Sequence, residues 1–295
     1  MTDWKAFLAN YTAFGRKPSV ESYIDLFDPQ GTVFHPGMAA PIGIKDIPTF
    51  IANVLTRLED FQLIPMRWCV NTDTIFVEAN NTAHVAGKRL VWPATYCITL
   101  RGERVLRGRA YYDRAEVLSH FDPALAAKSL NVHATLLDSA ESPDAASSGT
   151  SAASVAEIYD RFVTPYVENW KNPDPQKFAQ FYSPEARMIN PGFERALRRE
   201  ELAGYYRELQ SQTPDLQLRL ETWAASPGLL FLEWTAVGTF LGKPLKLPVV
   251  DRFILKDCLA VEGVAYFDGL TLRALVDPSF ARFADIAGSA TGAPR

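Results

Sequence analysis

Residues 245–255 read LKLPVVDRFIL, an almost wholly apolar stretch with one carboxylate, Asp251, inside it. Residues 90–100 read LVWPATYCITL, which has the same pattern with Tyr96 in the place of the aspartate. The two stretches begin 155 residues apart. An ionised carboxylate in an apolar strand is costly unless it is paired or its pKa rises. The comparison therefore indicates a repeated unit whose second copy carries an acid that the first copy lacks.

Identity at this spacing extends along most of the chain. Matching pairs are Pro36-Gly37 with Pro191-Gly192, Asp60 with Asp215, Trp68 with Trp223, Glu78 with Glu233, Gly87-Lys88 with Gly242-Lys243, Pro93 with Pro248, Tyr111 with Tyr266, Asp113 with Asp268 and Asp122-Pro123 with Asp277-Pro278. The spacing stays at 155 throughout, and so long a period indicates two similar domains instead of a solenoid of short units.

The sequence between the copies predicts where the domains end. Residues 138–154 read DSAESPDAASSGTSAAS, which is poor in apolar anchors and typical of a flexible linker. We therefore predict a first domain over 1–135, a linker over 136–154, a second domain over 155–287 and a disordered tail over 288–295.

Each copy reads as helices followed by strands. In the second copy, apolar residues at helical spacing predict a helix over 155–171, with a kink or break at Pro165. A short helix over 175–182, a strand ending at Asn190 and a helix over 198–214 follow. Four strand-like runs then fill 216–269, and their alternation and turns predict an antiparallel meander. The expected fold class is α+β, with a curved antiparallel sheet packed on N-terminal helices in each domain.

Composition excludes several functions. The chain has 295 residues, 47% of them hydrophobic and 22% charged, and a formal net charge of -4. This charge argues against nucleic acid or an anionic membrane as the partner. We see no apolar run of 18 residues and no signal peptide, so we expect no membrane association. Three scattered cysteines make no disulfide framework, and the expected compartment is the cytoplasm.

Several short motifs of both copies carry a family resemblance. In the second copy they are Asn190-Pro191-Gly192, Pro214-Asp215-Leu216, Glu233-Trp234, residues 242–248, Asp251 and Tyr266-Phe267-Asp268. The first copy keeps His35-Pro36-Gly37, Asp60-Phe61, Gly87-Lys88, Pro93 and Tyr111-Tyr112-Asp113. The chain resembles, twice over, the SnoaL-like polyketide cyclase branch of the nuclear transport factor 2-like superfamily. The resemblance implies a cone-shaped domain with an apolar pocket, in which an aspartate at the position of Asp251 is the general acid/base.

Four residues of the second copy are the catalytic candidates. Asp251 with a raised pKa could remove a proton next to a carbonyl, and Tyr266 and Asn190 could donate hydrogen bonds to the resulting enolate. Glu233 could pair with Asp251 if its strand face lines the pocket; otherwise it is solvated or bridged to a cation. The structural alternatives for Asp251 are a salt bridge to a pocket-facing or rim arginine and a polar position on an exposed strand face.

The candidates for substrate binding come from both copies. Aromatic residues of the second copy could form a pocket wall or simply a core, and the first copy offers a histidine, a tyrosine and a cation. These residues are Trp223, Trp234 and Phe253 in the second copy and His35, Tyr96 and Arg109 in the first. Tyr96 is a poor general base, so the first copy is expected to lack the proton chemistry of the second.

Absent motifs narrow the chemistry further. The sequence has no His-x-x-x-His or paired-cysteine spacing, no glycine-rich phosphate or dinucleotide fingerprint and no nucleophile elbow. We therefore expect no cofactor and no metal.

The leading functional hypothesis is a cofactor-independent acid/base enzyme of the cyclase or isomerase kind. Its substrate would be a hydrophobic polyketide-, steroid- or terpenoid-like molecule, bound in the second domain and processed through an enolate. One alternative is an epoxide hydrolase or cyclase that uses a carboxylate pair, and another is a non-catalytic small-molecule binding protein. The two domains are expected to pack as an intrachain pseudo-dimer, and a homodimer is the other assembly considered.

Overall fold

The computed structural model describes residues 3–85, 87–122 and 153–280. The predicted tail and all but the last two residues of the predicted linker lie outside these ranges. The chain divides into two compact units, one of Met1–Ala134 with Asp268–Arg295 and one of Thr135–Phe267. Residues 268–280 thus group spatially with the first unit, although the repeat places them in the second copy. The domain limits drawn from the sequence stay predictions.

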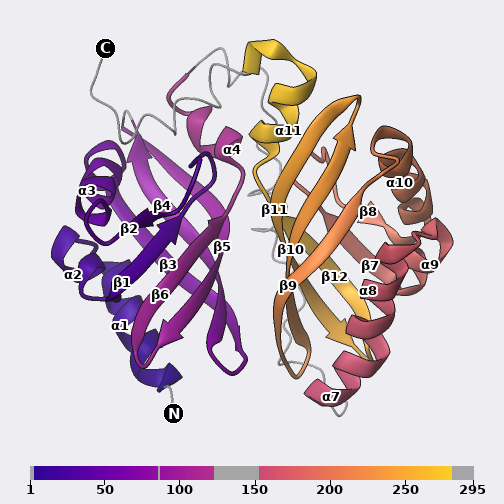
Figure 1. Ribbon diagram of the computed structural model, residues 1–295, viewed down its shortest axis with the longest axis horizontal. Helices are drawn as coiled ribbons and strands as arrows, with labels where there is room; N and C mark the ends of the chain where they lie inside the picture. The colour runs from indigo at the N-terminus through magenta and orange to yellow at the C-terminus, as the bar shows by residue number, and fades with distance from the viewer. Residues whose placement is uncertain (1–2, 86, 123–152, 281–295) are drawn as a thin grey trace. The chain divides into compact units, whose positions relative to one another are not determined.

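The first unit is a mixed sheet with helices against one face (Figure 1). Its elements are α1 (Trp4–Arg16), α2 (Val20–Ile24), β1 (Phe27–Phe34), β2 (Ile42–Gly43), α3 (Ile47–Arg57), β3 (Glu59–Val70), β4 (Thr74–Val85), β5 (Lys88–Arg101), β6 (Arg104–Tyr111) and α4 (Arg114–Leu118). The strand order is β2-β1-β6-β5-β4-β3. All neighbours pair antiparallel except β1 and β6, which are parallel.

The second unit repeats this plan. Its elements are α7 (Val155–Ile158), η1 (Tyr159–Val163), α8 (Thr164–Lys171), α9 (Pro175–Gln180), β7 (Tyr182–Ile189), β8 (Leu197–Arg198), α10 (Arg199–Gln212), β9 (Gln217–Ser226), β10 (Leu229–Phe240), β11 (Lys243–Lys256) and β12 (Leu259–Tyr266). The strand order is β8-β7-β12-β11-β10-β9. The α+β class and the antiparallel meander of β9 to β12 are confirmed, while the parallel pairing of β7 with β12 has no signal in the sequence.

The strand register repeats with the sequence spacing. Tyr96 lies opposite Val77 and Ala110, and Asp251 lies opposite Leu232 and Ala265. Each of these positions in the second unit is 155 residues after its counterpart in the first. Because one residue of slip would turn every side chain to the other face, equal register means that equivalent residues face the same side in both units.

The first helix of the second unit changes its hydrogen-bond pattern before Pro165. Ser154 and Glu157 form a capping box at its start. Residues Tyr159–Val163 form a π-helical turn, in which the N–H of Thr164 bonds to the carbonyl of Tyr159. Proline has no N–H and its ring crowds the carbonyl four residues earlier, so a wider turn before it lets the helix continue. The predicted kink or break is therefore a π-helical turn between α7 and α8.

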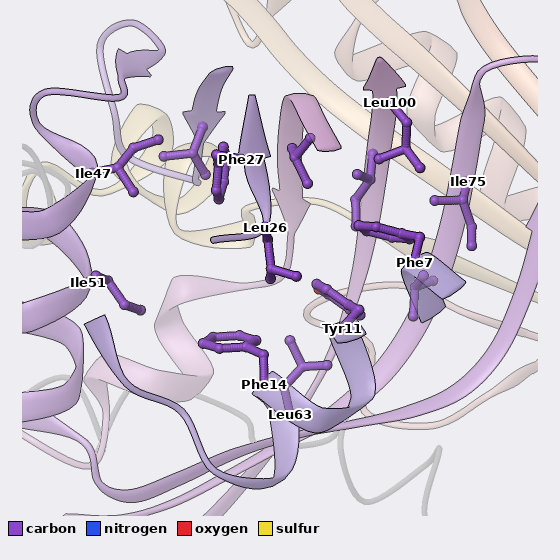
Figure 2. Close-up of a cluster of buried hydrophobic side chains, with 14 of the residues drawn as sticks. Phe7, Tyr11, Phe14, Leu26, Phe27, Ile47, Ile51, Leu63, Ile75 and Leu100 are labelled. Carbon is purple, nitrogen blue, oxygen red and sulfur yellow. The ribbon is translucent and has the colours of Figure 1, made fainter. Parts of the chain in front are cut away.

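Each core lies between the helices and one face of its sheet. In the first unit, labelled side chains of α1, α3 and strands β1, β3, β4 and β5 point toward one another in one buried cluster (Figure 2). In the second unit the corresponding space holds aromatic rings. Phe253 of β11 lies 5.0 Å from Phe162 and 5.4 Å from Tyr166, measured between ring centroids. The residues on the same face as Phe253 are therefore the interior residues of this unit.

Two equivalent aspartates lie close together in the first unit. Asp113 accepts hydrogen bonds from the N–H groups of Ala115 and Leu270, while Asp268 accepts from Arg114. Burial raises the pKa of Asp113 to about 6, and the charge of Arg273 offsets part of that rise. These bonds tie α11 (Gly269–Val276) to α4, which accounts for the spatial grouping of residues 268–280. The 3-10 turn η2 (Pro278–Phe280) follows. No helix in the described ranges is long and apolar enough to span a membrane.

A matched pair of glycines tests how tightly the second interior is packed. A Cβ at Gly263 would lie 2.8 Å from the Tyr182 hydroxyl, whereas one at the equivalent Gly108 would lie no nearer than 3.5 Å to any neighbour. Gly263→Ala is expected to lower the free energy of unfolding by about 1–3 kcal/mol, and Gly108→Ala by less than about 1 kcal/mol. Denaturant unfolding of the full chain measures both. Adding Tyr182→Phe to Gly263→Ala should recover part of the loss, and equal effects of the two glycine variants would contradict this account.

Candidate functional site

Asp251 lies on the interior face of the second sheet. Its neighbours along β11, Val250 and Arg252, are both buried. Phe253, two residues further along, contacts the ring of Phe162 in the helical layer. Two side chains on one strand that are two residues apart share a face, so Asp251 points toward the same interior. Its cross-strand neighbours are Leu232 on β10 and Ala265 on β12, both buried and apolar.

One hydrogen bond supports the Asp251 carboxylate. The indole Nε1 of Trp234 donates to its Oδ2 at 3.0 Å. Among the described residues, Asp251 makes no ion pair, so the predicted alternative of a salt bridge to arginine is not what this structure contains. Burial raises the pKa of Asp251 to about 7, and the Trp234 hydrogen bond offsets part of that rise. A carboxyl that titrates near neutrality can take up and return a proton.

Four tyrosines surround this carboxylate, and sequence reasoning did not name them as site residues. They are Tyr166 on α8, Tyr182 on β7 and Tyr205 and Tyr206 on α10. Burial raises the pKa of each, and the charge of Asp251 contributes to each rise. All four therefore remain neutral donors at physiological pH. The Tyr206 hydroxyl donates to the sulfur of Met188 at 3.8 Å.

Asn190 lies beside this tyrosine group. Its Nδ2 donates to the hydroxyl of Tyr205 at 2.8 Å. Tyr205 is only partly buried, and its ring contacts Phe193 at 5.2 Å. Asn190, which the sequence put forward as a catalytic candidate, is thus hydrogen-bonded to one of the four tyrosines near Asp251. Its predicted catalytic role stays a prediction.

Tyr266 and Glu233 lie on the opposite face of the sheet from Asp251. Both pair with Val250, the residue that precedes Asp251 on β11. Because successive side chains of a strand alternate between faces, neither can share the interior with Asp251. Tyr266 therefore does not lie beside Asp251, and Glu233 does not form the carboxylate pair that the sequence left open as one alternative.

The exterior face of the same strands carries paired charges. Glu262 of β12 accepts from Arg252 of β11 and from Arg187 of β7, and both Arg252 and Glu262 are fully buried. Burial alone raises the pKa of Glu262, but the two guanidinium groups outweigh it and lower that pKa below its usual value. The two faces of the sheet thus differ in how their carboxylates are paired. Glu262 on one face has two arginine partners, whereas Asp251 on the other face has no ion pair among the described residues.

The aromatic candidates of the second unit have distinct surroundings. Trp234 is the hydrogen-bond donor to Asp251, which the sequence did not reveal. Phe253 is buried in the ring cluster under the helices. Trp223 pairs with Leu232 on the interior face and stacks on Tyr159 with ring centroids 5.3 Å apart. Their predicted contact with a substrate stays a prediction.

His35 and Tyr96 both line a cavity in the first unit. The Tyr96 hydroxyl donates to Oδ1 of Asn81 at 2.9 Å. Burial lowers the pKa of His35 to about 4, so its ring is neutral near pH 7. Arg109 borders the same cavity, but it pairs with Cys97 on the other face of β5 and its Nη2 donates to the Cys97 sulfur at 3.0 Å. The Arg109 guanidinium thus bonds on the face opposite Tyr96, and its predicted role in substrate binding stays a prediction.

A comparison of the two copies could have found the tyrosine group from sequence. At the 155-residue spacing, Tyr182, Tyr205 and Tyr206 replace Phe27, Phe50 and Ile51. Each exchange adds a hydroxyl, and all three hydroxyls lie near the acid that replaces Tyr96. Polar residues that replace apolar ones in only one of the two copies, at positions scattered along the sequence, can therefore indicate a functional site in that copy. In the described ranges, no cluster of three or more His, Cys, Asp or Glu side chains is placed to hold a metal ion.

Comparisons with known proteins agree with the sequence resemblance. Residues 163–263, which lie in the second unit, match the family model of the SnoaL-like domain. No curated protein matches the chain.

Similar solved structures each span about one copy of the repeat. A protein with a ketosteroid isomerase-like fold from Catenulispora acidiphila is 20% identical over 41% of this chain and 93% of its own, with a TM-score of 0.37. A candidate SnoaL-like polyketide cyclase from Jannaschia is 18% identical over 40% and 90%, with a TM-score of 0.36. IdmH, a candidate polyketide cyclase from Streptomyces antibioticus, is 19% identical over 41% and 98%, with a TM-score of 0.36.

The single hydrogen bond to Asp251 makes a testable contribution to its titration. Trp234→Phe removes the donor that favours the ionised form, so the pKa of Asp251 should rise further above about 7. Carbon-13 NMR of the aspartate carboxyls would follow the titration in the wild-type and variant proteins. A matched Trp223→Phe variant, which removes no bond to Asp251, should leave its pKa near the wild-type value. An Asp251 resonance that titrates near 4 in the wild type would contradict the account.

The raised pKa also predicts how stability depends on pH. Since folding raises the pKa of Asp251 from 3.8 to about 7, the folded state holds the proton more tightly, and stability falls as pH rises through this window. Asp251→Asn removes the buried charge. At pH 8 the free energy of unfolding of the variant should therefore exceed that of the wild type by roughly 1–3 kcal/mol, and the difference should vanish near pH 4. Urea unfolding at both pH values measures this, and a variant that is less stable at pH 8 would overturn the assignment of an uncompensated charge.

Proposed function

We propose that the SnoaL-like domain of the second unit is a cofactor-independent acid/base catalyst, in which Asp251 moves a proton on an apolar small molecule that carries a carbonyl group. The supporting observation is the carboxyl itself. It lies on the interior face with one hydrogen bond, no ion pair among the described residues and a pKa near neutrality. An acid that is kept uncompensated in an apolar interior costs stability, which is characteristic of catalytic groups.

The reaction begins with removal of a proton next to the carbonyl. Asp251 in its ionised form takes the proton, and the electron pair moves onto the carbonyl oxygen to form an enolate. The protonated Asp251 can then return its proton at another atom. A pKa near the working pH suits both steps, because neither the ionised nor the neutral form is then rare.

Neutral hydroxyl donors next to Asp251 would stabilise the enolate oxygen. Tyr205 is held by Asn190 and is partly buried, so its hydroxyl is the best placed to meet a guest molecule. Tyr166, Tyr182 and Tyr206 are further neutral hydroxyls near the carboxyl, since the charge of Asp251 contributes to the rise of each pKa. Preorganised donors of this kind typically contribute a few kcal/mol to the stabilisation of an oxyanion.

The surroundings favour an apolar, ring-containing substrate. Trp234, Phe253 and Trp223 share the interior face with Asp251, so most of the contact offered there is aromatic. The SnoaL-like match and the resemblance to polyketide cyclases support a polyketide-like substrate with an acidic C–H, and a cyclisation or isomerisation as the outcome.

Epoxide opening is the weaker hypothesis. It requires an acid and a base on either side of the substrate. Glu233 lies on the exterior face, so the geometry supports proton transfer by one carboxyl and offers no partner from that strand position.

Hydrogen–deuterium exchange tests the proposal without knowledge of the product. The full chain in D₂O is incubated with a 1,3-diketone, a steroid enone and a terpenoid ketone, and NMR follows loss of the acidic C–H. Asp251→Asn should lower the catalysed rate roughly 100-fold or more while leaving affinity near wild type. The wild-type rate should rise with pH and level off above about 7.

Glu233→Gln is the matched control, because it removes a carboxylate from the opposite face of the neighbouring strand. It should exchange at nearly the wild-type rate, and a loss equal to that of Asp251→Asn would support the carboxylate pair instead. Binding of the panel with no exchange above the uncatalysed rate would contradict the enzyme proposal and favour a binding protein.

A further inference from the structure

The first unit contains a cavity that the proposed reaction does not use. It has a volume of about 60 Å³. Since one water needs roughly 10–15 Å³ on this measure, the cavity has room for a small ring. It is bordered by residues of α1, α3 and the interior face of the sheet, including Tyr11, Phe14, Phe27 and Leu63. Figure 2 shows these four side chains within the surrounding cluster.

Apart from Arg109, the titratable side chains that line this cavity in the described part of the chain are neutral near pH 7. The pKa of His35 is about 4, and burial raises the pKa values of Tyr11, Tyr23 and Tyr96. The Arg109 guanidinium bonds to Cys97 on the other face of the sheet. Tyr96 stands where the second unit has its acid, and Ala79 stands where the second unit has Trp234. The cavity therefore offers no proton acceptor of the kind that Asp251 provides.

One end of the cavity is nevertheless polar. The imidazole of His35 has no hydrogen-bond partner among the described residues; its backbone N–H bonds to the sulfur of Met38 and its ring packs 4.9 Å from that of Phe50. The Tyr96 hydroxyl donates to Asn81 and keeps its lone pairs for another donor. A neutral imidazole offers one donor and one acceptor. Phe34 pairs with Arg109 and Tyr96 pairs with Ala110, so His35 and Tyr96 lie in one row on either side of β6. Together they match a group such as a hydroxyl, which both donates and accepts.

We propose that this cavity is a second, non-catalytic binding site, which takes an uncharged ring-sized molecule bearing one hydroxyl or carbonyl group at the His35–Tyr96 end. The lining away from His35 and Tyr96 is apolar, so a ring placed there displaces no strongly hydrogen-bonded water. A charged guest would be rejected, because its charge would be buried without a partner. The two units would then bind by different rules: the second holds an acid for proton transfer and the first only retains its guest.

Phenol, benzene and benzoate form a matched set of probes. They share one ring and differ in bearing a hydroxyl, no polar group and a negative charge. All four histidines of the chain precede residue 134, so selective ¹⁵N-histidine labelling of the full chain reports on the first copy alone. Phenol should shift the His35 resonance with a Kd on the order of millimolar, benzene should bind more weakly, and benzoate should have no effect. The His84 resonance is the internal reference.

Variants separate a true site from general binding. Tyr96→Phe should weaken phenol binding by roughly 5-fold or more and leave benzene binding unchanged. Ala110→Leu, opposite Tyr96 on β6, should fill the cavity and abolish both. Asp251→Asn should change neither, which keeps this test independent of the proposed reaction.

Two results on the wild-type protein would overturn the proposal whether or not Ala110→Leu folds. One is a His35 resonance that does not respond to phenol up to its solubility limit. The other is benzoate binding as tightly as phenol, which would show that the cavity tolerates a charge.

Discussion

Alternation of side chains along β11 decides where the charges of the second unit lie. Asp251 and Arg252 are neighbours in sequence, yet one points into the interior and the other to the exterior face. Arg252 is matched there by Glu262, which Arg187 also contacts. Asp251 meets the indole of Trp234 and a set of tyrosines. A carboxyl that cannot reach the arginine next to it keeps its raised pKa, and the proposed chemistry depends on this separation.

Duplication has preserved geometry while changing chemistry. Strand order and register are the same in both units, so each residue of the second interior can be compared with one residue of the first. Hydroxyls and an acid occupy positions in the second unit that hold Phe27, Phe50, Ile51 and Tyr96 in the first. The first interior keeps a small neutral cavity as a result, and the second gathers proton donors around a titratable carboxyl.

Close packing holds the polar group of the second unit in place. Gly263 lies where any side chain would collide with the hydroxyl of Tyr182, whose pKa is raised by burial and in part by the charge of Asp251. The equivalent Gly108 faces Phe27, which has no hydroxyl and leaves more room. Both copies have a glycine at this position, but only in the second unit does the absence of a side chain make room for a tyrosine hydroxyl.

Sequence alone determined the repeat, the α+β class, the meander of each sheet and the distinctive position of Asp251. These follow from spacing, alternation and composition, which are local properties of the chain. Tertiary structure decided which face each candidate occupies. Alternation shows that Tyr266 and Glu233 each share a face with their own second neighbours, but cross-strand register alone shows that both lie behind Asp251 and not beside it. It also decided that Trp234 is a donor to Asp251 and that the Arg109 guanidinium bonds to Cys97. The physical reason is that a hydrogen bond or an uncompensated charge depends on what lies across the strand, and residues far apart in sequence supply those neighbours.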